Sequence, residues 1–300
     1  MTAADIWLFV QQGVVSGLVT GSIYALLALA IVIIFKTTDV PNFAQGEVFM
    51  GGAYIALYSV IVLSAGLSIA IAAALLFTMI ICAVFQRVIL RQVQKASGVS
   101  VNLVIATLGF SYLLKGVVRA TGLGDTPRSL PAVFSSDPVT IGQASITVLD
   151  VAIFTIAVSV MLALFWMFNK TKLGKALRAV GMNPRGSQLV GISLTRMHML
   201  IWVISGLISA IAAILIAPKI LMTADMGNIV TLGFAAAIIG GFTSLPGAII
   251  GGFVVGILEN LVGLFISTKA IVVAPFLAIM LVLLLRPQGL LGGKVQVKKL

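Results

Sequence analysis

Charged residues are scarce in this 300-residue sequence, at 9% of the chain, whereas an average globular domain has about 25%. Hydrophobic residues make up 60%, and the mean hydropathy is +1.20. A soluble protein of this composition would expose apolar patches and aggregate, but a lipid bilayer accepts such a surface. The composition therefore excludes a soluble domain and predicts an all-α polytopic membrane protein.

Cysteine and phosphate-binding motifs are also lacking. One cysteine, Cys82, excludes an intrachain disulfide, and no Cys/His cluster has the spacing of metal ligands. The sequence has no GxxxxGK[ST] loop, because Gly292-Gly293-Lys294 is followed by Val295. We therefore expect no metal, no cofactor and no enzymatic activity in this chain. If ATP drives its function, another chain binds the ATP.

Apolar runs of about 20 residues, the length that spans a bilayer, are instead frequent. The residues before 13 contain no Lys or Arg, unlike a cleavable signal peptide, so we expect the first span to be retained. The nine predicted spans form a single transmembrane domain over residues 1–300, and the second and seventh are short and glycine-rich. They lie near 13–35, 47–64, 66–85, 99–118, 146–168, 198–217, 229–244, 247–267 and 270–285.

The net charge is +11, from 19 Lys/Arg against 8 Asp/Glu. Segments 86–97 and 169–197 and the tail from 286 hold 13 of the basic residues and no acid. Nine spans place all three on one side, which the positive-inside rule makes the cytoplasm, with the N-terminus outside and the C-terminus inside. The charge is thus explained by topology rather than by nucleic acid.

Two predicted loops are long. The external loop, 119–145, is rich in Gly and Pro and is expected to be irregular. The internal loop, 169–197, is basic, with a weakly helical patch over 173–180 and a break at 181–184. Such a helix could simply lie on anionic membrane lipids, or it could bind a partner.

Glycines recur at four-residue spacing within the spans, as at Gly13, Gly17 and Gly21, and at Gly252 and Gly256. Small residues at this spacing let helix backbones approach closely. We therefore interpret these glycines as helix-packing positions.

Polar residues interrupt the apolar pattern at the start of the second span. Asn42 could cap a helix, with Gln45 reaching back as in a capping box, and Glu47 would complement the helix dipole. Alternatively, this is a discontinuous helix whose polar side chains, with the neighbouring Phe43, line a solute path.

A second polar pair, Glu259-Asn260, lies inside the eighth span. A carboxylate at membrane depth is costly and should face the bundle interior or water. Glu259 shares a helix face with Gly252, Gly256 and Gly263, so it either pairs structurally or lines a pathway. The short second and seventh spans also occupy equivalent places in the two halves, a weak sign of an inverted repeat with broken helices.

The segment Asn42–Met50, followed by Gly52–Tyr54, resembles the LivH-type permease of branched-chain amino acid ABC importers. The resemblance covers nearly the whole chain. Further similar motifs are Gly21–Leu26, Gly174–Ala179, Leu189–Ile192, Gly240–Ala248, Gly251–Gly252 and Arg286–Gly292.

This resemblance implies a permease of the bacterial inner membrane that imports branched-chain or other hydrophobic amino acids. The implied partners are a second homologous permease, two cytoplasmic ATPase subunits that bind the ATP, and a periplasmic or extracellular amino-acid-binding protein, which loop 119–145 could meet. The ATPase would dock on loop 169–197. The candidate coupling residues are Gly174, Lys175, Arg178, Gly191 and Ile192, and the candidate pathway residues are Asn42, Phe43, Gln45, Glu47, Glu259 and Asn260.

The sequence departs from the family pattern in two places. Many relatives have His where this chain has Gln45, and an acidic residue usually follows the stretch that ends at Ala179, where this chain reads Val-Gly-Met-Asn. Two other functions remain open. One is an ABC permease for urea or short amides, and the other is an ion-coupled secondary carrier that uses Glu47 or Glu259.

Overall fold

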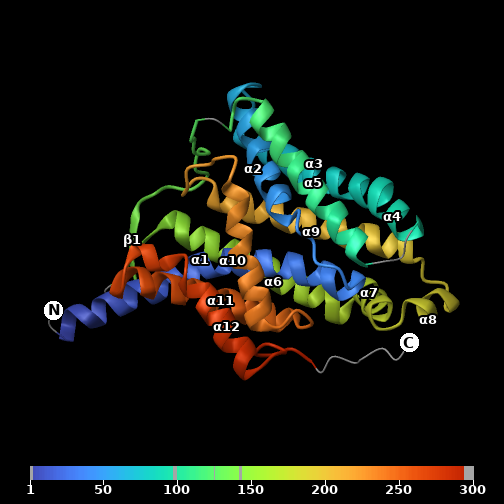
Figure 1. The fold of residues 1–300 in the computed structure, drawn as a ribbon. Coiled ribbons are helices and arrows are strands. Elements are labelled where there is room, and N and C mark those ends of the chain that lie inside the picture. The colour runs from blue at the N-terminus through green and yellow to red at the C-terminus, as the bar shows by residue number, and fades with distance from the viewer. Residues whose placement is uncertain (1–2, 97–99, 125, 142–143, 294–300) are drawn as a thin grey trace. The chain divides into compact units, whose positions relative to one another are not determined.

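The structure is a computed structural model that describes residues 3–96, 100–124, 126–141 and 144–293. Outside these ranges lie four charged residues of the predicted loops and tail, which are Asp125, Lys294, Lys298 and Lys299. As the composition predicts, the described chain is overwhelmingly α-helical (Figure 1). Its α-helices are α1 (Ala3–Thr38), α2 (Gln45–Ile61), α3 (Leu67–Val84), α4 (Arg91–Ala96), α5 (Ser100–Ala120), α6 (Val148–Lys170), α7 (Lys172–Met182), α8 (Pro184–Leu189), α9 (Leu194–Ile216), α10 (Val230–Gly240), α11 (Leu245–Phe265) and α12 (Ala274–Leu285).

Shorter elements join these helices. A π-helical segment, η1 (Phe85–Leu90), links α3 to α4, and two 3-10 turns, η2 (Met226–Ile229) and η3 (Thr268–Ile271), precede α10 and α12. Strands β1 (Pro138–Ile141) and β2 (Ala144–Thr147) pair antiparallel, with Val139 opposite Ile146. The predicted external loop 119–145 is therefore not irregular throughout, because its β-branched residues pair as a hairpin.

Six helices of the described chain are long and apolar enough to cross a membrane. They are α1, the continuous helix Leu67–Ala96, α5, α6, α9 and α11, while Met226–Gly240 and Ala274–Leu285 are shorter apolar helices. Helix α2 has 17 residues. These elements correspond to the nine predicted apolar segments, and the number that cross the bilayer stays a prediction. The basic segment 86–97, predicted as a loop, is helical as far as Ala96, since no Gly or Pro interrupts it.

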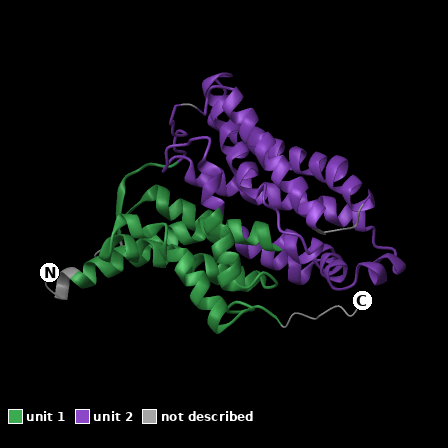
Figure 2. Cartoon of the chain, viewed as in Figure 1, with its two compact units in different colours: residues 1–32, 134–159, 231–300 green, residues 33–133, 160–230 purple. Residues whose placement is uncertain are grey.

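The chain divides into two compact units (Figure 2). Unit 1 comprises residues 1–32, 134–159 and 231–300, and unit 2 comprises residues 33–133 and 160–230. Unit 1 therefore contains most of α1, the hairpin, α10, α11 and α12. Unit 2 contains α2, α3, α5 and α9, together with the short helices α4, α7 and α8.

In unit 1, α1 and α11 cross with their backbones in contact. A Cβ on Gly17 would lie 2.6 Å from the Ile257 Cα, and a Cβ on Gly256 would collide with the Gly21 backbone. Likewise, a Cβ on Gly252 would collide with Ala25. The prediction that these glycines are packing positions is confirmed.

Replacing Gly256 with alanine should therefore force α1 and α11 apart. Overpacking of this kind costs about 1–3 kcal/mol, and the detergent-purified variant should lose its fold at a lower temperature. The matched control is Gly116→Ala in α5, because no atom lies within 4 Å of its added Cβ. That variant should be as stable as the wild type or slightly more stable, since alanine favours helix. Equal melting temperatures for both variants would contradict the proposed packing.

In unit 2, α2, α3 and α9 pack against one another, and α5 packs against α2 (Figure 1). Small residues again permit the close approach, since a Cβ on Gly206 of α9 would lie 2.7 Å from the Cys82 sulfur of α3. Near η1 the packing is aromatic. Phe85 stacks on Phe110 with ring centroids 4.0 Å apart, and Trp202 meets Phe85 edge-on at 5.4 Å. These contacts fix η1 against α5 and α9.

At another end of unit 2, the segment before η2 is joined to α5. The Lys115 amine lies 2.5 Å from a carboxylate oxygen of Asp225, and Arg119 lies 3.6 Å from the same oxygen. Nearby, Arg128 and Met222 exchange backbone hydrogen bonds. The hydrogen bond to Lys115 and then the Lys115 charge hold the pKa of Asp225 below its ordinary value.

A depressed pKa means that the ion pair stabilises the fold above the ordinary aspartate pKa of 3.8 and that this contribution is lost as the pH falls through the lower folded value. Replacing Asp225 with asparagine should therefore reduce thermal stability slightly at pH 7 and low salt. The difference from the wild type should shrink in high salt, because this pair is exposed and screened. Melting curves at pH 7 with and without added salt test this, and a salt-independent difference would refute it.

Candidate functional site

The start of α2 is organised by a turn that precedes the helix. The Asn42 side-chain oxygen accepts a hydrogen bond from the Ala44 N–H at 3.0 Å, and its amide donates to Gln45 Oε1 at 2.7 Å. The N-cap is Ala44, which makes no side-chain cap. The predicted capping box is therefore wrong in detail, because Asn42 orders the turn and Gln45 faces the Asn42 side chain instead of the backbone.

Gln45 also connects α2 to α9. The Ser205 hydroxyl donates to Gln45 Oε1 at 3.1 Å, and the Gln45 amide donates to the Ser209 hydroxyl. Asn42 and Gln45 are each only 1% exposed. A buried polar network is stabilising when its members are all hydrogen-bonded, so these four side chains form a rigid polar joint within an apolar helix pair.

The first turn of α2 also contacts the 3-10 turn η2 within unit 2. A Cβ on Gly46 would lie 2.5 Å from the Gly227 carbonyl oxygen, so the first turn of α2 touches the backbone of η2, the turn that precedes α10. Phe43, before α2, is 42% exposed, and Glu47 is half-buried. A helix start that packs against a short turn beside polar side chains resembles the broken helices of transporter solute sites.

The other two candidate pathway residues belong to unit 1. Glu259 and Asn260 are half-buried on α11, and the Glu259 carboxyl group hydrogen-bonds the Tyr24 hydroxyl of α1. Asn260 donates to the Thr20 hydroxyl and to the Gly256 carbonyl oxygen, each at 2.9 Å. Glu259 Oε2 is buried and, among the described residues, has no hydrogen-bond partner.

The six candidate pathway residues thus fall into two groups. The structure brings Asn42 and Gln45 together in unit 2, and Glu259 and Asn260 together in unit 1. The residues that complete the two groups were not predicted from the sequence; they are Ser205 and Ser209 in unit 2, and Thr20 and Tyr24 in unit 1. Each of them is a polar residue in an apolar helix, which is the pattern that could have indicated a functional role. Serine is nevertheless common in membrane spans, and only the fold shows which residue each serine contacts.

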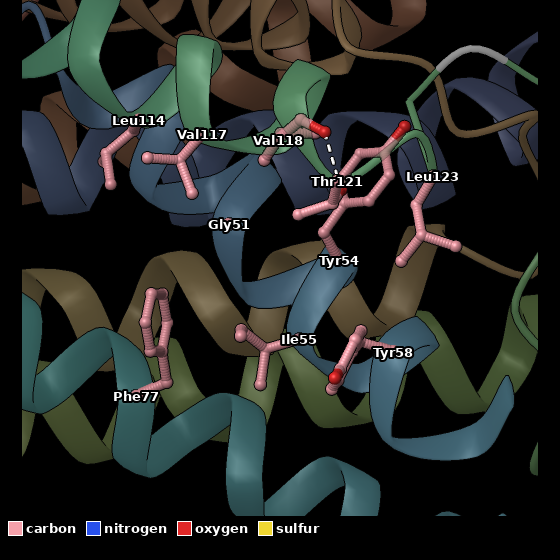
Figure 3. A pocket seen from close by; sticks show the side chains of 10 residues that line it. All are labelled: Gly51, Tyr54, Ile55, Tyr58, Phe77, Leu114, Val117, Val118, Thr121 and Leu123. Atoms are coloured by element: carbon pink, nitrogen blue, oxygen red, sulfur yellow. Dashed lines mark hydrogen bonds between the residues drawn. The ribbon is translucent and has the colours of Figure 1, made fainter. Parts of the chain in front are cut away.

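An apolar cavity of about 90 Å³ opens between α2, α3 and α5 (Figure 3). Tyr54 and Tyr58 of α2, Phe77 of α3 and Leu114 of α5 are among the residues that line it. The Thr121 hydroxyl at its edge is engaged, since it donates to the Val118 carbonyl oxygen at 2.7 Å. The lining contains no charged residue, so the cavity can hold an apolar group but cannot neutralise the ammonium and carboxylate groups of a free amino acid.

The predicted helical patch over 173–180 lies within α7, which ends at the predicted break. The short helix α8, which the sequence did not predict, follows the break and packs against α7, so the two form an α7–α8 hairpin. Thr171 caps α7 by accepting from the Gly174 N–H at 3.1 Å, and Asn183 caps α8 by accepting from the Gly186 N–H at 2.9 Å. Leu177 and Val180 are buried on one face of α7. Gly191, with φ of +85°, then turns the chain toward α9.

Two glycines allow α7 to pack closely against the ends of α6 and α1. A Cβ on Gly174 would collide with the carbonyl oxygens of Met167 and Phe168 at the end of α6. A Cβ on Gly181 would lie 2.5 Å from the Lys36 carbonyl oxygen. Of the other coupling candidates, Lys175 is exposed, while Arg178 and Ile192 are half-buried. The hairpin is thus held by its backbone on one side and presents basic and apolar side chains on the other.

The family model and the most similar curated sequences indicate one family. The profile of the family described as the permease component of the branched-chain amino acid transport system matches residues 13–285. The permease LivH of Escherichia coli K12 is 31% identical, with 95% of this chain and 96% of LivH covered. BraD of Pseudomonas aeruginosa, a permease of the same kind, is 29% identical, with coverage of 96% and 97%.

One solved structure, PsaBC from Streptococcus pneumoniae in complex with Fab, covers 91% of this chain and 90% of its own, with 15% identity and a TM-score of 0.46. The sequence matches, together with the apolar helices, establish a multi-pass transport subunit that works with other components of an ABC transporter. The chain belongs to the LivH-type family of permease components of branched-chain amino acid transport systems.

Proposed function

We propose that this permease forms half of the translocation path of an ABC importer for branched-chain or other hydrophobic amino acids in a bacterial inner membrane. The second half would be a homologous permease, and two cytoplasmic subunits would hydrolyse the ATP. A periplasmic or extracellular binding protein would deliver the solute at loop 119–145. The topology would place the N-terminus outside and the C-terminus in the cytoplasm.

The α7–α8 hairpin is the observation that carries this proposal. Met182, Leu189 and Val190 are strongly exposed, with Leu189 at 89%, although the hairpin carries basic residues and no acid. Exposed apolar side chains on a basic helical element are typical of a docking surface. A partner ATPase that covers this surface could move the hairpin, which would pull on α6 and α1 through Gly174 and Gly181.

The solute path would run past the polar groups that the apolar helices hold. Asn42, Gln45 and Glu47 would support the interrupted start of α2, with Phe43 exposed beside them. Glu259 and Asn260 would contribute from α11. Because the apolar cavity of Figure 3 has no charged lining, we assign to it no part in holding the charged groups of the solute.

Uptake assays in a host strain that lacks the chromosomal copy of the gene test this function. Cells that express the chain with its partners should accumulate labelled leucine, isoleucine or valine, and a Walker-motif mutation in the partner ATPase should abolish accumulation. Labelled urea is the discriminating probe. ATP-dependent accumulation of urea but not of leucine would replace the amino-acid proposal with the amide alternative.

An ion-coupled carrier is a separate candidate, favoured by the half-buried Glu259 carboxyl group, of which Oε2 has no hydrogen-bond partner among the described residues. The variant Glu259→Gln keeps the shape and removes the charge. An importer should retain ATP-dependent uptake whose pH profile matches the wild type. Loss of a pH-dependent, ATP-independent exchange in this variant would instead support the carrier.

A further inference from the structure

A polar cleft lies where the α3 helix continues into η1 and α4. Its volume is about 350 Å³, and short π-helical segments such as η1 are frequent at functional sites. Two elements of unit 2 form the cleft, the continuous helix through η1 and the beginning of α9. It is lined by Gln86, Arg87 and Arg91 from the first, and by Ser193, Thr195, Arg196 and Met199 from the second.

The cleft is positively charged and uncompensated. Within the described ranges, no acidic group forms an ion pair with Arg87, Arg91 or Arg196. Segments 86–97 and 169–197, which supply these arginines, contain no Asp or Glu at all. Three guanidinium groups around one cleft repel one another unless an anion joins them, and guanidinium geometry suits phosphate oxygens.

Gln86 adds a hydrogen-bond acceptor to the positively charged cleft. Its side chain is only 1% exposed, and its Oε1 has no hydrogen-bond partner among the described residues. Leaving a buried acceptor unsatisfied costs about 1–3 kcal/mol. A ligand with a hydroxyl group next to its phosphate would donate to this oxygen while the arginines hold the phosphate.

The length of the helix places the cleft at the membrane surface. The continuous helix Leu67–Ala96 has 30 residues, and about 20 residues at about 1.5 Å each cross the hydrocarbon core. If Leu67 starts at one interface, Gln86 and Arg87 reach the other. Arg196 likewise lies in the first turn of α9, which is itself a candidate span.

Apolar side chains flank the charges on the same segment. Val88 and Ile89 are 50% and 40% exposed, directly after Arg87. Apolar side chains at this level suit acyl chains, while the arginines lie at the depth of headgroups. Val88 and Ile89 belong to the apolar helix Leu67–Ala96, itself a candidate membrane span, so the acyl chains of the bilayer are the apolar surface expected next to them.

We propose that this cleft binds the headgroup of an anionic phospholipid that carries a hydroxyl group, as phosphatidylglycerol does. The phosphodiester lies among Arg87, Arg91 and Arg196, and a glycerol hydroxyl donates to Gln86 Oε1. A lipid bound here clamps the α3–α4 helix to the start of α9, directly beside the α7–α8 hairpin in sequence.

Native mass spectrometry of the detergent-purified chain, titrated with defined lipids, tests the site. Wild type should retain phosphatidylglycerol with at least about tenfold higher apparent affinity than phosphatidylcholine, equivalent to about 1.4 kcal/mol. The triple variant Arg87→Gln, Arg91→Gln, Arg196→Gln should lose this preference. A charge-matched control, Lys95→Gln, Lys172→Gln, Arg185→Gln, removes three exposed cations from the same segments outside the cleft and should keep it.

Gln86→Leu tests the hydroxyl contact without changing charge. Wild type should prefer phosphatidylglycerol to phosphatidylmethanol, which has the same charge and no hydroxyl, and this variant should bind both equally. Thermal melts verify that each variant is folded, and if the triple variant is not, the three single Arg-to-Gln variants replace it, each of which should weaken the preference. Equal retention of phosphatidylcholine by wild type would overturn the proposal. So would binding of free glycerol phosphate as tight as that of the lipid, or loss of bound lipid when the partner ATPase is present.

Discussion

Replacing Gly174 with alanine is expected to reduce uptake by about 5- to 150-fold, the range that a coupling free energy of about 1–3 kcal/mol spans. The added Cβ collides with the carbonyl oxygens of Met167 and Phe168, which belong to the rigid end of α6. Overpacking against backbone costs about 1–3 kcal/mol, and tilting α7 away from α6 relieves it. A tilted hairpin can still meet an ATPase but transmits its movement poorly.

Gly181→Ala should have a similar effect, because its Cβ would lie 2.5 Å from the Lys36 carbonyl oxygen. Gly109→Ala in α5 is the matched control, since no atom lies within 4 Å of its Cβ, and its uptake should equal that of the wild type. ATP hydrolysis and uptake should be measured on the same complexes. Loss of uptake with ATP hydrolysis retained is the expected result. Full uptake by Gly174→Ala would show that the close packing of α7 against α6 does not matter for coupling.

Replacing Gln45 with leucine should have the second large effect, on stability and on uptake together. The substitution removes the partner that Asn42, Ser205 and Ser209 share, and a buried polar group that loses a hydrogen bond in this way costs about 1–3 kcal/mol. The network joins α2 to α9, so its loss should loosen the start of α2 where it meets Gly227. We expect a melting temperature several degrees lower and uptake near background.

The control for this variant is Gln92→Leu. Gln92 is exposed on α4, and its replacement removes the same amide from a place where water satisfies it. Its melting temperature should stay close to that of the wild type. If Gln45→Leu melted at the wild-type temperature, the network would be energetically neutral, and its assignment as a rigid joint would be wrong.

Much of the architecture could be predicted from the sequence because a bilayer imposes length and composition on each span. The apolar segments, the helical break near Asn183 and the packing role of Gly17, Gly21, Gly252 and Gly256 all follow from local pattern. The positive-inside rule also predicts that segments 86–97 and 169–197 lie on one side of the membrane. In the structure, Arg87 of the first segment and Arg196 of the second line the same cleft, which agrees with this prediction.

Other features depend on contacts between residues far apart in the sequence. The sequence predicts Gln45 to be a capping partner of Asn42. Its hydrogen bonds to Ser205 and Ser209, however, join residues 160 or more positions apart, and no local pattern predicts them. Nothing in the sequence around Gln86 indicates a binding site, since an amide side chain near the end of a membrane span is common. Its significance comes from burial beside three arginines, which only the packing of η1 against α9 produces.

The most direct test of the importer proposal is purification of the tagged chain from its own host in gentle detergent, followed by mass spectrometry of the proteins that accompany it. We predict recovery of a Walker-motif ATPase and a second multi-span permease, and loss of the ATPase alone when α7 is displaced by Gly174→Leu. A chain that emerges folded and alone at several detergent strengths would contradict the account.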